Sequence, residues 1–413
     1  MRILSGAAAE RRVRQLENRG SDFAPLEPKV RKIMEDVRRD GDRAVRRYAE
    51  KWDGLRRAAA LRVSQTELDS AANSVPPTLR NSLKQAAANI RQFCQWQKPQ
   101  AWTRPVDGIS LGQIVRPIGS VGCYVPGGRH PLVSTLLMTV IPAQVAGVPE
   151  IRVVSPNPSI EVMAAAQLLG VREVYRVGGA QAIAALAYGT KSIPRVDKVV
   201  GPGNIYVTIA KKLVAFDCAI DFLAGPTEAV VLSKRGRADF IAADLVAQAE
   251  HDPAAIPVFV TTSKRLARDV SERVQNLLAT NEVAAESVRQ NGAILLAPSE
   301  KRATDWANRI APEHITIDEE YLDAVEKAGS VFVGDYSAQA AGDYASGPNH
   351  VLPTAGVARF RGGLTVGDFV KIITVQRVSR KGLFAIQDTV TQLAETEGLA
   401  AHAGSIRVRC ANA

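Results

Sequence analysis

Apolar residues recur along this chain with two spacings, and each spacing predicts a different element. Near the N-terminus Val30, Ile33 and Val37 stand three or four positions apart, which predicts an amphipathic helix that Gly41 ends. Short continuous runs rich in β-branched residues predict buried strands instead. On these grounds we expect a helix from 29 to 40, a second one after it, another at 79–93 and a strand at 111–117.

Between residues 151 and 226, short apolar runs alternate regularly with helical patterns. Repeated strand and helix units of this kind are typical of a parallel, doubly wound sheet. The expected strands are 151–154, 174–177 and 198–200, and the expected helices are 159–169, one beginning near 180 and one ending at 212.

A second series with the same rhythm follows, without a close sequence repeat of the first, so we predict two α/β domains rather than one. After Gly334 the rhythm stops. Residues 343–353 are rich in Gly, Pro, Asn and Asp and predict an ordered loop, and 383–395 predict a helix. The strands expected in the second series are 229–232, 257–261, 294–296, 314–317 and 331–333.

Three glycine-rich segments, 119–128, 178–181 and 201–204, are candidate ligand contacts. Glycine lets the backbone approach a ligand closely, and the carboxyl ends of parallel strands are where α/β proteins bind ligands. The first segment does not match the G-x-G-x-x-G pattern of dinucleotide sites. Each segment could equally be a tight turn without a ligand.

The size and charge of the chain narrow its class. A length of 413 residues exceeds one ordinary core, which again favours two or more domains. The formal net charge of +10 would suit a nucleic acid or an anionic cofactor such as a dinucleotide. In 38–57, however, arginines alternate with acidic residues, which is typical of a solvated helical surface. We therefore do not expect a nucleic-acid partner.

The chain shows no sign of export or membrane insertion. Its four cysteines have no C-x-x-C spacing, which excludes a zinc ribbon or a disulfide framework and fits a reducing cytoplasm. The N-terminus lacks the apolar stretch of a signal peptide. The uncharged run 131–148 approaches membrane-spanning length, but Pro142 and Gln144 interrupt it, so we interpret it as a buried helix.

Gln248 and His251 stand three residues apart at the end of a predicted helix, where their side chains can converge on one metal ion. Pro253 disfavours helical geometry just beyond them. An imidazole together with amide and carboxylate oxygens suits Zn²⁺. Alternatively, His251 caps the helix C-terminus and Gln248 is merely solvated.

Two further pairs combine an acid with a histidine. Glu313 and His314 precede an apolar strand and have different basicities, as proton transfer often requires, yet in an ideal strand they would face opposite sides. The pair could also be ordinary surface charge. Glu397 and His402 are five positions apart, about 140° on a regular helix, unless the glycine between them breaks it.

Taken together, these motifs resemble the histidinol dehydrogenase family over nearly the whole chain. The matching segments are 97–99, 121–128, 178–187, 201–208, 224–228, 248–251, 312–314, 342–353 and 397–402. Three positions depart from the common pattern: Thr227 replaces a serine but keeps a hydroxyl, Ala311 stands where glycine often precedes Pro-Glu-His, and Ile209 stands where glutamate is common.

The resemblance implies a role for each candidate residue. One Zn²⁺ per subunit would be bound, and two residues would carry acid/base chemistry on L-histidinol with NAD as cofactor. The implied zinc ligands are Gln248, His251, Asp343 and His402; the acid/base residues are Glu313 and His314; the NAD contacts are Tyr124, Gln181 and Asn204; and Thr227, His350 and Glu397 join the zinc ligands and His314 in holding the substrate.

The resemblance also implies an architecture of two incomplete Rossmann-like domains with parallel sheets, a short N-terminal arm and a small helical C-terminal domain in an intertwined homodimer. Glu397 and His402 would then complete the active site of the partner. The expected divisions are an arm at 1–20, a first α/β domain at 21–123 and 228–363, a second at 124–227, and the C-terminal domain at 364–413.

The implied reaction is the four-electron oxidation of L-histidinol through the aldehyde to L-histidine, with two NAD⁺ and one water. Three alternatives stay open at this point. They are a related dehydrogenase of another amino alcohol or small diol, a zinc hydrolase that needs no dinucleotide, and a basic nucleic-acid-binding protein.

Overall fold

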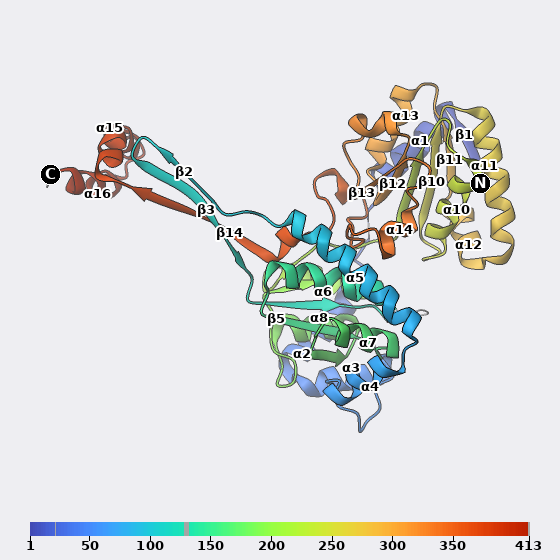
Figure 1. The fold of residues 1–413 in the computed structure, drawn as a ribbon, viewed down its shortest axis with the longest axis horizontal. Helices are drawn as coiled ribbons and strands as arrows, with labels where there is room; N and C mark the ends of the chain where they lie inside the picture. The colour runs from blue at the N-terminus through green and yellow to red at the C-terminus, as the bar shows by residue number, and fades with distance from the viewer. Residues whose placement is uncertain (21, 128–131, 412–413) are drawn as a thin grey trace.

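The computed structural model describes residues 1–20, 22–127 and 132–411, which form two α/β lobes and a long arm (Figure 1). Outside these ranges lie residues 21 and 412–413 and the segment 128–131, which holds the end of the glycine-rich segment 119–128 and the start of the uncharged run. The predicted α/β class with parallel sheets is confirmed.

The first lobe contains a six-stranded parallel sheet in the order β1-β11-β10-β9-β12-β13. Its strands are β1 (Arg2–Ser5), β9 (Glu228–Leu232), β10 (Ile256–Thr261), β11 (Ala293–Leu296), β12 (His314–Ile317) and β13 (Ser330–Val333). Its helices are α1 (Gly6–Glu17), α10 (Ala238–Ala249), α11 (Lys264–Leu277), α12 (Glu282–Asn291), α13 (Glu300–Ile310) and the short α14 (Gln339–Tyr344).

Helices cover both faces of this sheet. Successive strand residues point to opposite sides, so neighbouring residues of one strand pack with different helices. Val230 packs with α1 and α13, and its neighbour Val231 packs with α10, α11 and α12. A strand that is buried on both faces needs apolar residues at successive positions, which explains the continuous apolar runs from which these strands were predicted.

The second lobe contains a five-stranded parallel sheet in the order β6-β5-β4-β7-β8. Its strands are β4 (Ser120–Tyr124), β5 (Glu150–Ser155), β6 (Glu173–Arg176), β7 (Lys198–Val200) and β8 (Ala219–Ile220). Its helices are α2 (Glu27–Asp40), α3 (Asp42–Trp52), α4 (Gln65–Ser74), α5 (Pro77–Gln97), α6 (Val133–Ala146), α7 (Ile160–Leu168), α8 (Gly179–Tyr188) and α9 (Ile205–Val214).

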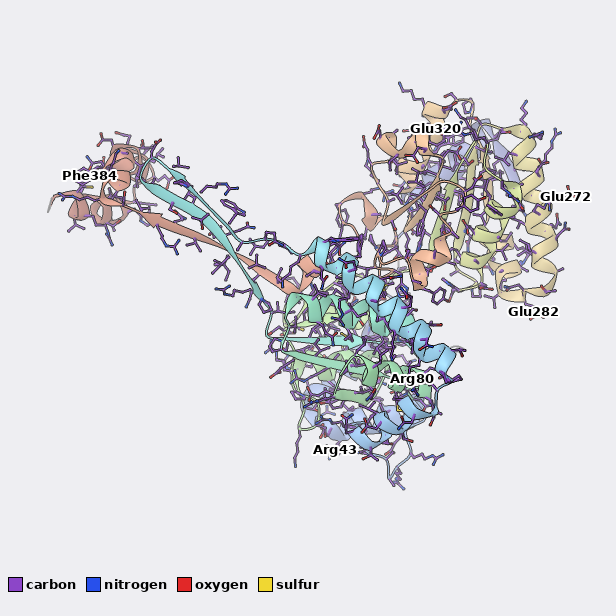
Figure 2. All side chains as sticks on the ribbon, viewed as in Figure 1. Arg43, Arg80, Glu272, Glu282, Glu320 and Phe384 are labelled. Atoms are coloured by element: carbon purple, nitrogen blue, oxygen red, sulfur yellow. The ribbon has the colours of Figure 1, made fainter. Side chains whose placement is uncertain are left out.

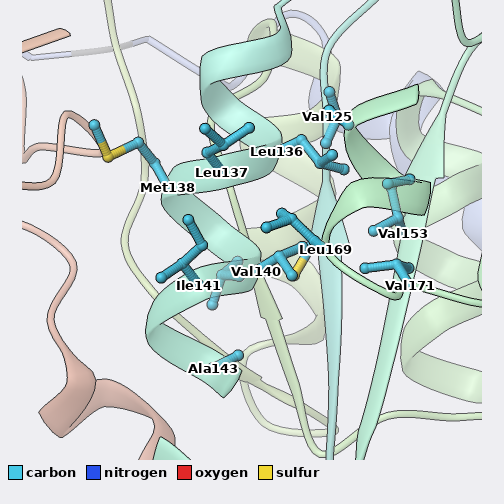
Figure 3. Close-up of a cluster of buried hydrophobic side chains, with 14 of the residues drawn as sticks. Val125, Leu136, Leu137, Met138, Val140, Ile141, Ala143, Val153, Leu169 and Val171 are labelled. Carbon is cyan, nitrogen blue, oxygen red and sulfur yellow. The ribbon is translucent and has the colours of Figure 1, made fainter. Parts of the chain in front are cut away.

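Helices α5, α6 and α7 cover one face of the second sheet, and α2, α3, α8 and α9 cover the other. Figure 3 shows Leu136, Val140 and Ile141 of α6 in the first of these cores, with Val153 of β5 nearby. Helix α6 is apolar on all sides and contains Pro142, as the buried-helix interpretation of the uncharged run predicted. Among the described residues, no helix combines the length and apolarity needed to cross a membrane.

The arm is a three-stranded antiparallel sheet with a helical pair at its tip (Figure 1). It consists of β2 (Trp102–Val106), β3 (Ile109–Pro117), β14 (Val370–Val378), α15 (Arg380–Thr396) and α16 (Ala400–Ala411). Residues from two distant parts of the sequence therefore pair along its whole length and carry the chain terminus away from both lobes.

The structure corrects the expected divisions of the chain. Helices α2 to α5, which we assigned with 228–363, pack instead on the sheet of the second lobe. The expected N-terminal arm supplies the edge strand β1 and the helix α1 of the first lobe. Periodicity shows that a segment is an amphipathic helix but not which sheet it covers, because any apolar face of suitable size would serve.

Two further expectations were wrong at the level of single elements. The first half of the glycine-rich segment 119–128 is the central strand β4, since Val121 and Cys123 are fully buried between neighbouring strands. The C-terminal segment 364–413 is not wholly helical, because it contains the nine-residue strand β14. Strand β14 is largely exposed, although it contains the β-branched run 372–375, which we did not assign to a strand.

The predicted solvated surface in 38–57 is present. Arg39, Arg43 and Arg47 pair with the carboxylates of Asp36 and Asp40. Figure 2 shows Arg43 and other labelled charged side chains at the outer surfaces of both lobes, and Phe384 at the tip of the arm.

Candidate active site

A cluster of polar side chains lies at the amino-terminal edge of the sheet in the first lobe. His314 is the first residue of β12 and Glu228 the first residue of β9, two strands that pair in parallel. Helix α10 runs back between the parallel strands β9 and β10, so its last turn, with Gln248, returns to this edge. The negative end of the helix dipole there favours a cation.

Asp343, in the last turn of α14, links most of the cluster. Its Oδ2 accepts a hydrogen bond of 2.8 Å from Gln248 Nε2, and its Oδ1 lies 3.2 Å from His314 Nε2. Its backbone oxygen lies 2.7 Å from Nδ1 of the half-buried His350. Burial alone would raise the pKa of Asp343, but its neighbours, chiefly His314, outweigh burial and lower it.

The side chains of Glu313 and His314 lie in the same buried site, although the side chains of neighbouring strand residues usually point to opposite faces. Glu313 Oε2 lies 3.8 Å from His314 Nδ1 and accepts a 3.1 Å hydrogen bond from the backbone of Glu228. The exposed fractions of Glu313 and His314 are 8% and 3%, so the alternative of ordinary surface charge was wrong. The ring of His314 stacks on that of Phe332, with centroids 5.9 Å apart.

The environment shifts the pKa values of both groups. Burial raises the pKa of Glu313 to about 8. Burial alone would lower the pKa of His314, but the charge of Glu313 and the contact with Asp343 outweigh it, so the pKa is raised. A carboxyl group poised near neutrality is suited to general acid/base work.

Three of the four expected metal ligands lie in or beside this cluster. The Oε1 atom of Gln248 is buried without a hydrogen-bond partner, as an amide oxygen awaiting a cation would be. His251 is exposed just beyond α10, three residues after Gln248. Within the described part of a single chain, no three residues among His, Cys, Asp and Glu are placed to hold a metal ion.

The fourth expected ligand is not brought to the cluster within this chain. His402 is exposed in the first turn of α16, and Glu397 is exposed at the end of α15, both at the tip of the arm (Figure 1). Thr227 lies immediately before β9, partly exposed, beside the cluster. The expected substrate contacts are therefore divided between lobe and arm.

The expected cofactor contacts line one cavity of about 820 Å³ in the second lobe, at the carboxyl ends of β4 and β5. Tyr124, Gln181 and Asn204 all contribute to its wall. The chain crosses from β6 on one side of β4 to β7 on the other, and such a switch in strand order opens a crevice for ligands.

The glycine-rich turns around this cavity are held by side chains. Tyr124 accepts a 3.1 Å hydrogen bond at its hydroxyl from Gly179 N. Asp53 accepts one of 2.9 Å from Gly178 N and one of 3.1 Å from the amide of Gln181. Asn204 caps α9 through Oδ1, so the turn-forming alternative holds for its side chain whether or not it also meets a ligand.

Sequence reasoning missed three residues that support the cavity. Asp53 was included in the solvated stretch 38–57, but burial raises its pKa, and it faces the cavity. Lys211 and Asp221 form a buried ion pair that holds both backbone groups of Gly201: Lys211 Nζ donates to its oxygen at 3.0 Å, and Asp221 Oδ2 accepts from its nitrogen at 2.8 Å. The available signal was Lys211 itself, a lysine within the predicted helix that ends at 212.

Comparison with known proteins gives one consistent result. A family model described as histidinol dehydrogenase matches residues 16–410. The chain is 45% identical to the histidinol dehydrogenase of Methanothermobacter thermautotrophicus over 414 residues, covering 97% of each chain, and 42% identical to that of Listeria monocytogenes over 425 residues, covering 99% of each. It is similar to the crystal structure of histidinol dehydrogenase from Elizabethkingia anophelis with a TM-score of 0.94 and 35% identity, covering 100% of this chain and 98% of that one.

Proposed function

The chain belongs to the histidinol dehydrogenase family, and from this membership we propose that it oxidises L-histidinol through the aldehyde to L-histidine, with two NAD⁺, one water and one Zn²⁺ per subunit. The observation that carries the proposal is the buried set of Glu313, His314 and Asp343 beside the unpartnered amide oxygen of Gln248. This set of side chains combines an acid/base pair with candidate metal ligands.

The donor set of the first lobe fits Zn²⁺. An amide oxygen, an imidazole and a carboxylate come from Gln248, His251 and Asp343, and a second imidazole would come from His402 of the partner subunit. When bound, the ion would hold the imidazole and amine of the substrate and so orient the carbon that is oxidised.

The proton transfers fall to His314 and Glu313. His314 accepts the hydroxyl proton of the alcohol while the adjacent carbon loses hydride to NAD⁺. Glu313 then takes a proton from the water that adds to the aldehyde, while His314 returns its proton to the aldehyde oxygen as the hydrate forms. His314 accepts a proton again, from the hydrate, as the second hydride passes to the second NAD⁺. General acid/base groups of this kind contribute about 10² to 10⁴ in rate.

The cavity of the second lobe is the proposed NAD site. Tyr124, Gln181 and Asn204 line it, and Asp53 orients the amide of Gln181. The bound dinucleotide supplies the hydride acceptor, and the apolar part of the wall, including Trp52 and Ile160, excludes water from its rings.

The arm supports a domain-swapped homodimer. It exposes large apolar side chains that a soluble monomer would not leave in water. Among them are Ile372, Ile373, Val378, Leu393, Leu399 and Val408, with exposed fractions of 42% or more. Packing of this surface on a second copy would bring Glu397 and His402 to the cluster of the partner.

The decisive experiment supplies zinc-loaded protein with L-histidinol and counts NADH per molecule consumed. We expect two. One NADH would mean that oxidation stops at the aldehyde, and none would favour the zinc hydrolase. Faster NADH formation from another amino alcohol or a diol than from histidinol would replace the proposed substrate.

Removal of the metal gives an independent test. Chelation should abolish turnover of L-histidinol, and added Zn²⁺ should restore it. Without the ion, Gln248 and Asp343 have nothing through which to anchor the substrate. Full activity after chelation, verified by metal analysis, would reject the zinc assignment.

A further inference from the structure

A buried ion pair lies directly behind the acid/base cluster. Arg19, in the segment that follows α1, contacts Glu228 with two guanidinium nitrogens, Nε at 2.5 Å from Oε1 and Nη2 on Oε2. The exposed fractions of the two side chains are 12% and 3%. Planar pairing of this kind fixes direction as well as distance.

Arg19 also uses its remaining donors. Nη1 donates to the backbone oxygens of Leu16 and, at 2.6 Å, of Ile310, and Nη2 donates to that of Ala311 at 3.2 Å. A guanidinium group has five N–H donors, and these contacts occupy all of them. One side chain thus ties the N-terminal segment, β9 and the end of α13 together.

Ala311 needs this support. Its φ of 48° places a residue other than glycine in the left-handed region, where the side chain crowds its own backbone. The turn leads through Pro312 into Glu313, and Arg19 holds the carbonyl groups on its near side. On its far side, Gly329 N and Ser330 N donate to the oxygens of Pro312 and Glu313, each at 2.9 Å.

Glu228 completes the connection to the acid/base pair. Its Oε1 also accepts a 2.8 Å hydrogen bond from Ala355 N, so the carboxylate is anchored on two sides. Its own backbone N–H donates to Glu313 Oε2 at 3.1 Å. The side chain of Glu228 therefore fixes the backbone that in turn holds the carboxyl group of Glu313.

We propose that Arg19 and Glu228 are positioning residues that hold the Glu313 carboxyl group beside His314 for the aldehyde step, Arg19 by supporting the left-handed turn at Ala311 and Glu228 through its backbone N–H. The inference rests on the proposed function, because it assigns the supports of the group that activates water. Neither residue touches the substrate. Through Arg19, the segment after α1 helps to position the acid/base residue Glu313. The sequence alone indicated no role for this segment.

The test compares the two half-reactions separately. Glu228→Gln retains hydrogen-bonding atoms but removes the charge that orients Arg19. We expect kcat for aldehyde oxidation to fall about tenfold to a hundredfold, since small misplacement of a reacting group has effects of that size. Alcohol oxidation by His314 should change less than about twofold, and KM for NAD should not change. Arg19→Lys keeps the charge but loses the planar fork, and it should show the same selective loss.

Arg309→Lys is the matched control. Arg309 also ties α13 to α1, through Glu10 and Glu17, but the structure gives its side chain no contact with Ala311 or Glu228. The control should lower Tm and leave the ratio of the two half-reactions unchanged.

A second comparison tests the turn itself. Glycine adopts the left-handed conformation without a steric cost, so Ala311→Gly in the Arg19→Lys background should recover part of the lost aldehyde oxidation. Absence of recovery would overturn the role of the turn.

An equal loss of both half-reactions in Glu228→Gln and Arg19→Lys, or no loss, would overturn the positioning role. If Glu228→Gln does not fold, Arg19→Lys decides alone. Failure of the proposed function looks different: the wild type would not oxidise the aldehyde, or Glu313→Gln would oxidise it normally.

Discussion

Single residues set the chemistry of the cluster. From the sequence, a metal site was one of two interpretations of Gln248 and His251. Proton transfer was likewise one of two interpretations of the pair Glu313 and His314. The structure shows why neither could be decided earlier. The hydrogen bond that Glu313 accepts from Glu228 N and the contact between His314 and Asp343 join residues that are 85 and 29 positions apart in the sequence.

The shifted pKa of Glu313 predicts a pH dependence. Aldehyde oxidation should rise with pH, with a midpoint near the value of about 8 that burial produces, because only the ionised carboxylate accepts a proton. In Glu313→Gln this dependence should be absent and the step slower by about a hundredfold or more. Stopped-flow rates across pH would measure both, and a flat profile in the wild type would contradict the assignment.

The same shift makes a prediction about stability. The folded-state pKa lies above the ordinary value of 4.5, so this group's contribution is complete below the ordinary value and is lost as pH rises through about 8. The Tm of Glu313→Gln relative to wild type should therefore be higher at about pH 9 than at about pH 5. Calorimetry would check this, and a pH-independent difference would contradict it.

Gly201 is a position where one carbon atom should matter. Its φ is +113°, and an added Cβ would lie 2.2 Å from the backbone oxygen of Tyr124. Gly201→Ala should cost at least about 1–3 kcal/mol in free energy of unfolding and raise KM for NAD. Gly170→Ala is the control, since its φ is +70° but nothing lies within 4 Å. Equal effects of the two changes on KM for NAD would argue against a role of the Gly201 turn in the cofactor site.

At the scale of elements, the pattern of strands was predicted well. Strands β7 and β12 have the predicted bounds, and the other predicted strands of both parallel sheets agree within a residue or two, because short β-branched runs have few alternatives to a doubly covered strand. Strand β4 was missed because it lies within the glycine-rich segment that we interpreted as a turn, and β14 was missed although it contains the β-branched run 372–375. The packing partners of α2 to α5 were missed because they depend on tertiary contacts.

The turn between β7 and α9 is held by the ion pair of Lys211 and Asp221, whose side chains are 2% and 0% exposed. Lys211→Met should lower the free energy of unfolding by about 3–5 kcal/mol, since it leaves Asp221 buried without a counter-charge. Adding Asp221→Asn to this variant should return part of the loss. Chemical denaturation would measure both, and a loss below about 1 kcal/mol in Lys211→Met would show that water replaces the lysine.

At the scale of the whole molecule, the arm is the feature that divides the proposed site. Glu397 and His402 lie at its tip, far from the lobes of their own chain (Figure 1). Their role therefore depends on a second copy.

Complementation tests this arrangement. We expect His402→Ala and His314→Asn each to be inactive as pure proteins. If the arms are exchanged, refolding an equal mixture should restore roughly a quarter of wild-type activity, because half of the dimers are mixed and one of their two sites is intact. Each protein refolded separately is the control. No recovery in a mixture shown to contain mixed dimers would mean that the site is not formed between subunits.

The sequence by itself determined the class of the fold, most of its strands, the family resemblance and the residue types available for chemistry, because these depend on local spacing and residue identity. Only the tertiary structure decided which helices cover which sheet, that Glu313 and His314 share one buried place, and that Arg19, Glu228, Lys211 and Asp221 support the two sites. Those facts depend on contacts between segments up to hundreds of residues apart. Such contacts follow from how apolar faces and buried charges are satisfied together, which no local pattern records.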